Sequence, residues 1–394
     1  MPALPGAAEA PAGPFPLFLA GTPGLEALLA LEARRLGFAD AASAPGGVAL
    51  AGDWAAVRRA NLWLRGATRV LVRIAGFGAP HLAMLDKRAR RIDWGAVLRA
   101  DVPVSVQATS RRSRIYHAGA AAARVAQAIA DTLGAPILKT PGAEGAVGDD
   151  GAEPAARILV RLDEDFCTVS LDTSGPPLHR RGTKQAVAKA PLRETLAAGL
   201  LAAAGYDGRG TVLDPMCGSG TLVLEAAGIA AGAAPGAHRA FAFQHLACHD
   251  PDAWAAALAE AAPARPPRDV RCIGYDRDAG AVAAASANAA RAGLAVWTRF
   301  ATQPVSALAP PAGSECGLVI VNPPYGARIG DRASLAPLYA ALGRTLAGRF
   351  AGWRAALVTS DAGLAAATGL PFGPPGPPIP HGPLKIRLWQ ARIG

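Results

Sequence analysis

The segment Val212–Thr221, with the sequence VLDPMCGSGT, decides the fold. Its first apolar residues end a short predicted strand, and Thr221–Ala231 continues with the pattern of a helix. Between them Gly218 and Gly220 allow a ligand to approach the backbone closely and permit φ values that other residues avoid. The free N–H groups at the start of the helix would point at that ligand. A strand, a glycine loop and a helix in this order indicate a ligand site in an α/β sheet.

The glycine loop differs from the two common phosphate-binding loops. It has no Gly-Lys-Ser/Thr ending, and Val223 stands where a GxGxxG dinucleotide motif has its third glycine. Asp214, at the end of the strand, can instead accept hydrogen bonds from a ligand ammonium group, directly or through water. An ordinary tight turn of an α/β sheet is the alternative interpretation.

A second acidic residue, Asp276, ends the next predicted strand, Arg271–Tyr275. A carboxylate in this position can accept hydrogen bonds from both ribose hydroxyls of a nucleoside ligand. Asp278 follows at the start of a predicted helix and could simply cap that helix. Asp276 is therefore the better candidate for ribose binding.

The sequence Asn322-Pro323-Pro324-Tyr325 follows the apolar predicted strand Gly317–Val321. Two consecutive prolines form a rigid corner without N–H donors, which leaves the Asn322 amide oxygen and the Pro323 carbonyl free to accept hydrogen bonds. The exocyclic amine of a base is a poor nucleophile, because its lone pair is conjugated into the ring. Two acceptors would hold its N–H bonds in attacking geometry, while Tyr325 offers a stacking surface for an unpaired base. A proline-rich turn without a function is the alternative.

Strand and helix patterns alternate after residue 185, which predicts βαβ units and a parallel sheet with ligands at the carboxyl ends of its strands. A helix is expected over Pro191–Ala204 and a last strand over Leu384–Trp389. Before residue 185 the order predicts two small units of mixed α+β topology. They include a helix over Asp93–Leu98 and a hairpin formed by Ile158–Leu162 and Cys167–Leu171.

The chain carries 40 lysine and arginine residues against 30 aspartate and glutamate residues, a formal charge of +10. This excess favours a polyanionic partner such as nucleic acid, although an arginine-rich composition can also come from a GC-rich genome. No apolar run reaches the roughly 18 residues of a membrane span, and residues 1–14 resemble a loose tail rather than a signal peptide. The five cysteines form no CxxC pair, which argues against a disulfide framework or zinc site and favours the cytoplasm.

The three motifs together resemble those of class I S-adenosylmethionine-dependent methyltransferases that act on planar amino nitrogens. Over residues 15–390 the chain resembles the THUMP-domain RNA methyltransferases. Among these it resembles the bacterial 23S rRNA guanine-N2 methyltransferases most, and next the archaeal tRNA guanine-N2 methyltransferases. The segments that carry this wider resemblance are Gly24–Glu26, Leu64–Arg65, Arg69–Val70, Ser113–His117, Asp172–Gly175, Leu178–Gly182, Ala190–Ala197, Leu338–Tyr339, Gly352–Trp353 and His381–Leu384.

The resemblance implies an α/β fold in which a C-terminal Rossmann-like class I methyltransferase domain is preceded by ferredoxin-like and THUMP α+β domains. The implied parts are a flexible tail, a ferredoxin-like unit, a THUMP RNA-binding domain and the methyltransferase domain, at residues 1–14, 15–66, 67–170 and 171–394. The implied cofactor is S-adenosylmethionine, bound by Asp214, Pro215, Cys217, Gly218, Ser219, Gly220, Thr221 and Asp276. The implied catalytic residues are Asn322, Pro323, Pro324 and Tyr325.

The implied partner is RNA, as rRNA or a precursor of a ribosomal subunit, with neither a metal nor a membrane. Two basic runs in the N-terminal half are the candidate RNA contacts, and solvated surface charge is the alternative for both. Their residues are Lys87, Arg88, Arg90, Arg91, Arg111, Arg112 and Arg114.

The sequence departs from the family pattern in several places. The family usually has an aspartate after its third strand for the adenine amino group, whereas this chain has Phe300–Pro304 without a carboxylate. Ala327 stands where the family often has glutamate, and Thr183-Lys184 stands where it usually has Tyr-Arg. The contact to the cofactor's adenine is therefore open.

We expect methyl transfer from S-adenosylmethionine to guanine N2 in RNA, most of all in 23S rRNA, with tRNA as an alternative substrate. Asn322 and Tyr325 alone do not distinguish guanine N2 from adenine N6. A protein glutamine N5-methyltransferase is a further alternative, because Asn-Pro-Pro-Tyr also serves amide nitrogens, but the basic N-terminal half argues against it. The last alternative is an RNA-binding relative that has lost catalysis, which the missing carboxylate near Thr302 suggests.

Overall fold

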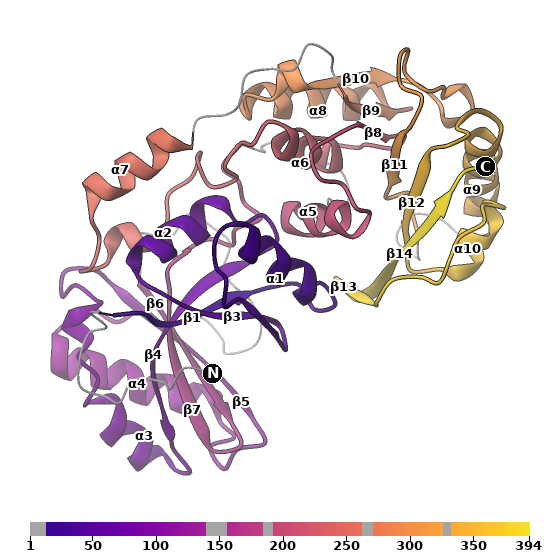
Figure 1. Ribbon diagram of the computed structural model, residues 1–394. Helices are drawn as coiled ribbons and strands as arrows, with labels where there is room; N and C mark the ends of the chain where they lie inside the picture. The colour runs from indigo at the N-terminus through magenta and orange to yellow at the C-terminus, as the bar shows by residue number, and fades with distance from the viewer. Residues whose placement is uncertain (1–12, 139–155, 184–191, 262–270, 326–331) are drawn as a thin grey trace. The chain divides into compact units, whose positions relative to one another are not determined.

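The computed structural model describes residues 13–138, 156–183, 192–261, 271–325 and 332–394. These residues form two compact units (Figure 1). Unit 1 comprises the described residues of 1–21, 29–178 and 239–260, and unit 2 those of 22–28, 179–238 and 261–394. No helix in the described part of the chain is long and apolar enough to cross a membrane.

Unit 1 is built on one seven-stranded sheet with the order β2-β3-β1-β4-β7-β6-β5. Its strands are β1 (Phe15–Ala20), β2 (Ala42–Ala44), β3 (Gly47–Gly52), β4 (Arg69–Gly78), β5 (Val104–Arg111), β6 (Ala156–Asp163) and β7 (Phe166–Asp172). Neighbouring strands are antiparallel except β5 and β6, and β6 with β7 forms the predicted hairpin. The sheet continues across residue 66, so the division into a ferredoxin-like and a THUMP domain there stays a prediction.

The helices of unit 1 follow the sequence patterns less closely than the strands. They are α1 (Glu26–Arg35), which begins among the residues of unit 2, α2 (Trp54–Trp63), α3 (Leu82–Ala89), α4 (Ala118–Leu133) and α7 (Pro251–Glu260). The helix predicted over Asp93–Leu98 was wrong, because only one 3₁₀ turn, η1 (Trp94–Ala96), forms there. Gly95 stands in the middle of this turn and has a low helix propensity. The segment is also too short for its hydrogen bonds to offset the entropy cost of helix nucleation.

A buried polar network fixes the end of β7. The Asn61 side chain of α2 donates to Thr173 Oγ1 at 2.9 Å and accepts from the Ser174 hydroxyl at 2.7 Å. Ser174 Oγ also accepts from the backbone N–H of Val70 at 2.8 Å. Buried polar groups cost little stability only when they are paired, and these pair with one another. The segment Asp172–Gly175 thus has a structural role in unit 1.

Residues 239–260 belong to unit 1, although they lie inside the segment that the sequence assigned to the C-terminal domain. The Phe243 backbone N–H in η2 (Ala242–His245) donates to the Thr173 carbonyl at 3.0 Å. The Trp254 ring of α7 packs edge-on against Phe241 and Phe243, with centroid distances of 5.6 and 5.1 Å. These contacts are long-range in sequence, so the predicted boundaries could not include them.

Unit 2 is built on a second seven-stranded sheet with the order β10-β9-β8-β11-β12-β14-β13. Its strands are β8 (Thr211–Asp214), β9 (Cys272–Asp276), β10 (Thr298–Thr302), β11 (Gly317–Val321), β12 (Arg354–Thr359), β13 (Ile379–His381) and β14 (Leu384–Arg392). Its helices are α5 (Glu194–Ala203), α6 (Thr221–Ala230), α8 (Ala279–Arg291), α9 (Arg332–Arg349) and α10 (Ala362–Ala367), with the 3₁₀ turns η3 (Ala295–Trp297) and η4 (Val305–Ala307).

The strands β10, β9, β8, β11 and β12 are parallel, as the alternation of strand and helix predicted. The last strand was expected to continue that pattern but is antiparallel to β12 and to β13. A two-residue connection containing Gly382 at φ 59° joins β13 to β14, and so short a connection can join only antiparallel strands. Helix α5 begins at Glu194, later than predicted, and Pro191 lies outside the described residues.

The helix–helix contact of α9 with the end of α10 generates a stability prediction. A Cβ atom added to Gly343 of α9 would overlap the carbonyl oxygen of Thr368. We expect Gly343→Ala to lower the free energy of unfolding by about 1–3 kcal/mol, because overpacking forces the two backbones apart. Gly348→Ala, on the same helix with open space around it, should not destabilise the protein. Urea denaturation checks both, and equal stabilities for the two variants would contradict the expected overlap.

Candidate active site

Three parallel strands bring the predicted site residues to one edge of the unit 2 sheet. Asp214 ends β8, Asp276 ends β9, and Asn322 directly follows β11. The register of β8 with its two neighbours places Asp276 and Asn322 two residues beyond the level of Asp214, about 7 Å along the strand direction. The strand order reverses at β8, and this is where α/β sheets bind ligands.

The glycine loop adopts a shape that requires its glycines. Gly218 and Gly220 have φ values of 52° and 87°, in the left-handed region. A Cβ atom on Gly220 would lie 3.0 Å from Ala285 and 3.1 Å from the Phe300 ring. Gly220 is also the N-cap of α6 and offers no side chain to the first N–H groups of that helix. The helix therefore presents donors to the loop, as the sequence predicted.

The Asp276 carboxylate ties the glycine loop to the end of β9. Its Oδ2 accepts from the Gly218 backbone N–H and its Oδ1 from the Asp278 backbone N–H, both at 3.0 Å. Each oxygen keeps a further lone pair for a ligand hydroxyl. Asp278 accepts from the Gly280 N–H at 2.8 Å and caps α8. The geometry thus gives Asp278 a structural role and leaves Asp276 as the candidate for ribose.

Asp214 is a buried carboxyl group, and one backbone hydrogen bond offsets little of the cost of removing it from water. Its side chain belongs to a residue that is 2% exposed, and Oδ1 accepts from the Met216 backbone N–H at 3.0 Å. Burial, and to a smaller extent the nearby Asp276 charge, raise the pKa of Asp214 from its ordinary 3.8 to about 8, although the Met216 hydrogen bond lowers it. A cation placed next to this carboxyl group would reverse that effect. The site therefore suits a ligand with an ammonium group.

The corner after β11 contains an unpaired buried acceptor. Asn322 Oδ1 is buried and has no hydrogen-bond partner among the described residues. The Tyr339 hydroxyl donates to the Pro324 carbonyl at 3.1 Å and fixes the corner. Tyr325 is half-buried, and burial raises the pKa of its phenol, which stays neutral. Buried acceptors are normally paired, so Asn322 marks a position where a ligand donor is expected.

The other residues predicted to bind the cofactor lie in the same glycine loop and have little access to solvent. Pro215, Cys217, Ser219 and Thr221 are all buried, so their side chains shape the loop more than they face solvent. Burial raises the pKa of the Cys217 thiol, which is therefore a poor nucleophile.

Two neighbouring residues were not predicted as site residues. The Phe300 ring of β10 packs against the loop, and Gly274 leaves room for it, since a Cβ there would lie 2.6 Å from the ring. Gln303 follows β10 where the family has its carboxylate. Its backbone N–H donates to the Asp276 carbonyl and its Nε2 to the Ala307 carbonyl, both at 2.9 Å, which leaves Oε1 as an acceptor. The sequence analysis named the segment Phe300–Pro304 only for its missing carboxylate and assigned no role to either residue.

The predicted RNA contacts lie in unit 1, and carboxylates pair with some of them. Arg90 contacts Asp86 and Asp131, Arg112 contacts Asp163 and Glu164, and Arg114 contacts Asp165. Lys87, Arg88, Arg91 and Arg111 have no carboxylate partner in the described part of the chain. Tyr116, which the sequence analysis did not single out for binding, is 87% exposed. The RNA role of these residues stays a prediction.

No group of three or more His, Cys, Asp or Glu side chains suited to a metal ion is found among the described residues. His249 is partly buried and its Nδ1 has no hydrogen-bond partner there. The five cysteines are all free thiols.

Comparison with known families gives two matches. Residues 181–370 match the RMKL-like methyltransferase domain. Residues 16–71 match the RlmL ferredoxin-like domain. Both fall where the sequence predicted these folds, and the α/β class with a C-terminal class I methyltransferase fold is confirmed.

The chain is also similar to individual proteins. It is 38% identical to the ribosomal RNA large subunit methyltransferase K/L of Syntrophotalea carbinolica, over 91% of this chain and 51% of that protein. It therefore spans about half the length of the curated relatives it matches. A predicted N6-adenine-specific DNA methylase from Listeria monocytogenes is 30% identical, with a TM-score of 0.83 over 97% of each chain. The protein SMU.472, solved as a complex with SAH, is 27% identical, with a TM-score of 0.83 over 97% of this chain and 98% of that one.

The buried state of Asp214 generates a prediction about stability and pH. Its pKa in the folded protein lies above its ordinary value, so this group's contribution to stability is complete below about pH 4 and is lost as the pH rises through about 8. Asp214→Asn should raise the unfolding temperature at pH 8 and flatten its dependence on pH between 5 and 8. Thermal unfolding without ligand checks this, with the exposed Asp207→Asn as the control. A lower unfolding temperature for Asp214→Asn at pH 8 would contradict the expectation.

Proposed function

Because this chain belongs to the family of RMKL-like methyltransferases, we propose that it transfers the methyl group of S-adenosylmethionine to guanine N2 of RNA, most of all of 23S rRNA. The observation that carries the proposal is the buried, unpartnered oxygen of Asn322, at the same sheet edge as Asp214 and Asp276. An exocyclic amine supplies the donor that this oxygen lacks. The name of the Syntrophotalea relative supports ribosomal RNA as the substrate.

The residues at the sheet edge fit S-adenosylmethionine. Asp214 would accept from the ammonium group of its methionine part, and the first turn of α6 would face its carboxylate. Asp276 would accept from the ribose hydroxyls while it keeps its two bonds to the backbone. Gln303 offers an amide oxygen for the adenine amino group in place of the family's carboxylate. The complex of SMU.472 with SAH supports the same cofactor class.

The bound cofactor would supply a methyl group on a sulfonium, which is already activated and needs no metal. The chain's own residues then have to position the amine and polarise it. Asn322 Oδ1 and the Pro323 carbonyl would accept from its two N–H groups, which directs its lone pair at the methyl carbon. The N–C bond would form as the methyl–sulfur bond breaks, which would leave the cofactor as a neutral thioether. The amine would then carry a positive charge that the two acceptors stabilise, and it would release one proton to solvent. Tyr325 would stack on the base as a neutral phenol.

Unit 1 supports RNA as the class of substrate. Lys87, Arg88 and Arg91 are cations without carboxylate partners among the described residues, on or next to α3. Arg111 ends β5, and the exposed Tyr116 follows in the connection to α4. Cations near an exposed aromatic ring are the usual combination for a phosphate backbone with unpaired bases.

The ribose role of Asp276 gives a binding prediction. Asp276→Ala should weaken S-adenosylmethionine binding by about 1–3 kcal/mol, the typical contribution of hydrogen bonds to a charged acceptor. Isothermal titration calorimetry measures this, with Asp278→Ala as the matched control, because Asp278 caps α8 and is not expected to touch the cofactor. Equal losses in the two variants would show that loop order, not the ribose contact, sets the affinity.

The target atom is tested by product analysis. The enzyme, labelled cofactor and undermodified 23S rRNA are incubated, and the RNA is digested to nucleosides. Labelled N2-methylguanosine supports the proposal, whereas labelled N6-methyladenosine would overturn the base assignment. Adenine N6 is the position named for the Listeria relative, a predicted DNA methylase. If the RNA stays unlabelled and the label is transferred to glutamine in a protein substrate, RNA is not the substrate and the proposed function is overturned.

The same assay tests the role of Asn322. Asn322→Ala should reduce the methylation rate by a factor of about 100 or more, in the range expected for loss of a stabilising group at a transition state. Its affinity for the cofactor should stay within about twofold of the unchanged protein, because the side chain holds only the amine. A variant that keeps most of its activity would refute amine polarisation by Asn322.

A further inference from the structure

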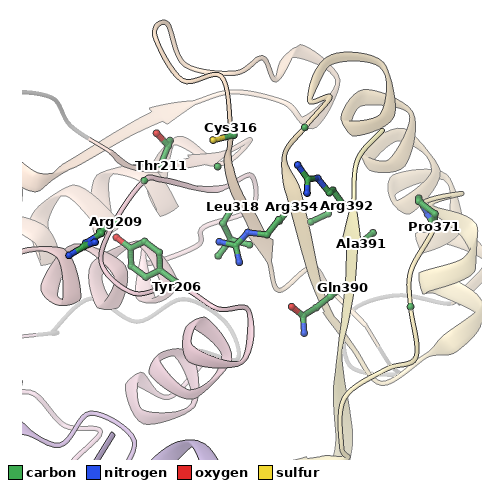
Figure 2. Close-up of a pocket in the computed structure, with 15 residues that line it drawn as sticks. Tyr206, Arg209, Thr211, Cys316, Leu318, Arg354, Pro371, Gln390, Ala391 and Arg392 are labelled. Carbon is green, nitrogen blue, oxygen red and sulfur yellow. The ribbon is translucent and has the colours of Figure 1, made fainter. Parts of the chain in front are cut away.

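A groove lies at the opposite edge of the same sheet from the candidate active site. It forms where β8, β11 and β12 begin and where the antiparallel β14 ends, and its volume is about 660 Å³ (Figure 2). Because β11 is five residues long, at about 3.3 Å per residue the two edges lie about 16 Å apart. The groove therefore cannot be part of the pocket for the reacting base.

The described lining of the groove is basic and contains no carboxylate. Arg354, at the start of β12, and Arg392, at the end of β14, lie side by side (Figure 2). Arg209 lies on the other side of Tyr206 from these two arginines (Figure 2). None of the three guanidinium groups contacts a carboxylate among the described residues, although the Arg209 backbone N–H donates to Asp207 Oδ1 at 3.0 Å. All three residues are exposed. A concave surface with one sign of charge concentrates the electrostatic field.

The arrangement of Arg354 and Arg392 is unfavourable without an anion. They are directly opposite each other in the ladder between β12 and β14, and like charges in such a cross-strand pair destabilise a sheet. Arg354 is partly fixed, because its Nη1 donates to the Ala204 carbonyl at the end of α5 at 2.6 Å. The Arg209 and Arg392 side chains form no such hydrogen bond with the described residues. An anion bound between the two guanidinium groups would remove this repulsion.

Glycines give a ligand access to the backbone of the groove. Gly210, Gly352 and Gly373 line it, and no side-chain atom lies within 4 Å of the place where a Cβ atom would stand at these three positions. At Gly317, which also lines the groove, the Trp353 ring covers the backbone. The guanidinium group bonds phosphate oxygens in a bidentate way, and the size of the groove exceeds that of a single ion. With a net charge of +10 on the chain, the polyanion best matched to this surface is a nucleic acid backbone.

We propose that this groove binds backbone phosphates of the RNA substrate, at a position remote from the base that reacts. The inference rests on the proposed function for its choice of RNA. Arg209, Arg354 and Arg392 are the phosphate contacts. RNA that reaches both edges of the sheet would be held in register at one edge while its target base enters the other.

The test uses the full chain and the double variant R209Q/R392Q, which leaves the structural hydrogen bond of Arg354 intact. Binding of transcribed 23S rRNA is measured by fluorescence anisotropy over a range of salt concentrations. We expect affinity to fall about tenfold at low salt, and the slope of log K against log salt to decrease by about 1–2, because two phosphate contacts are removed. The matched control is R299Q/R344Q, which removes two exposed arginines of unit 2 that lie outside the groove and form no ion pair within the described ranges.

Thermal unfolding and cofactor titration accompany the binding measurement. The unfolding temperature of R209Q/R392Q should rise or stay constant, because a like-charge pair is removed, and S-adenosylmethionine affinity should not change. A general loss of stability together with weaker RNA binding would identify a structural role and overturn the proposal. A saturable site for AMP that disappears in R209Q/R392Q while RNA binding stays unchanged would overturn RNA as the ligand.

The outcomes separate this inference from the proposed function. If the unchanged protein methylates RNA and R209Q/R392Q binds RNA like the control, the groove has no role and the proposed function stands. If the unchanged protein binds RNA without methylating it, the proposed function fails, and a selective loss of binding in R209Q/R392Q still supports the groove. If the unchanged protein does not bind RNA, both are overturned.

Discussion

The backbone hydrogen bonds between β9, β8 and β11 are the constraint on which the candidate active site depends. Parallel pairing brings the carboxyl ends of these strands to one edge, and the register sets Asp276 and Asn322 at the same level on either side of Asp214. A slip of one residue would turn the strand side chains to the other face of the sheet. The almost fully buried cores of β8 and β11 prevent that slip, so packing and site geometry are fixed together.

The site contains buried polar groups that lack full hydrogen-bond or charge partners, whereas such groups are normally paired in a purely structural sheet edge. Asp214 is a carboxyl group whose pKa burial raises to about 8, and Asn322 Oδ1 is an acceptor without a partner among the described residues. Both cost folding free energy, and ligand groups of opposite character would compensate for both. Asp276 is different, because it already accepts two backbone N–H groups and so shapes the loop before any ligand binds. The edge thus combines one preorganised carboxylate with two groups in need of a partner.

Unit 2 has two functional edges in this view, one at each end of the same strands. The residues proposed for methyl transfer lie at the carboxyl ends, and three arginines lie in the groove at the other edge. A sheet is a stiff spacer, so its strand length sets a fixed distance between the two edges. If both proposals hold, the strand length of the sheet sets the distance between the reacting base and the phosphates bound in the groove.

The sequence alone determined the strand–loop–helix at Asp214, the acidic end of β9 and the Asn322 corner, because glycine and proline restrict the backbone locally and their patterns are readable in one segment. The tertiary structure decided what depends on distant partners. It assigned residues 239–260 to unit 1 through contacts such as Phe243 with Thr173, and it formed β10 by pairing with β9. It also placed Arg354 opposite Arg392, which are 38 positions apart in the sequence, because cross-strand register follows from the packing of the whole sheet and no local signal encodes it.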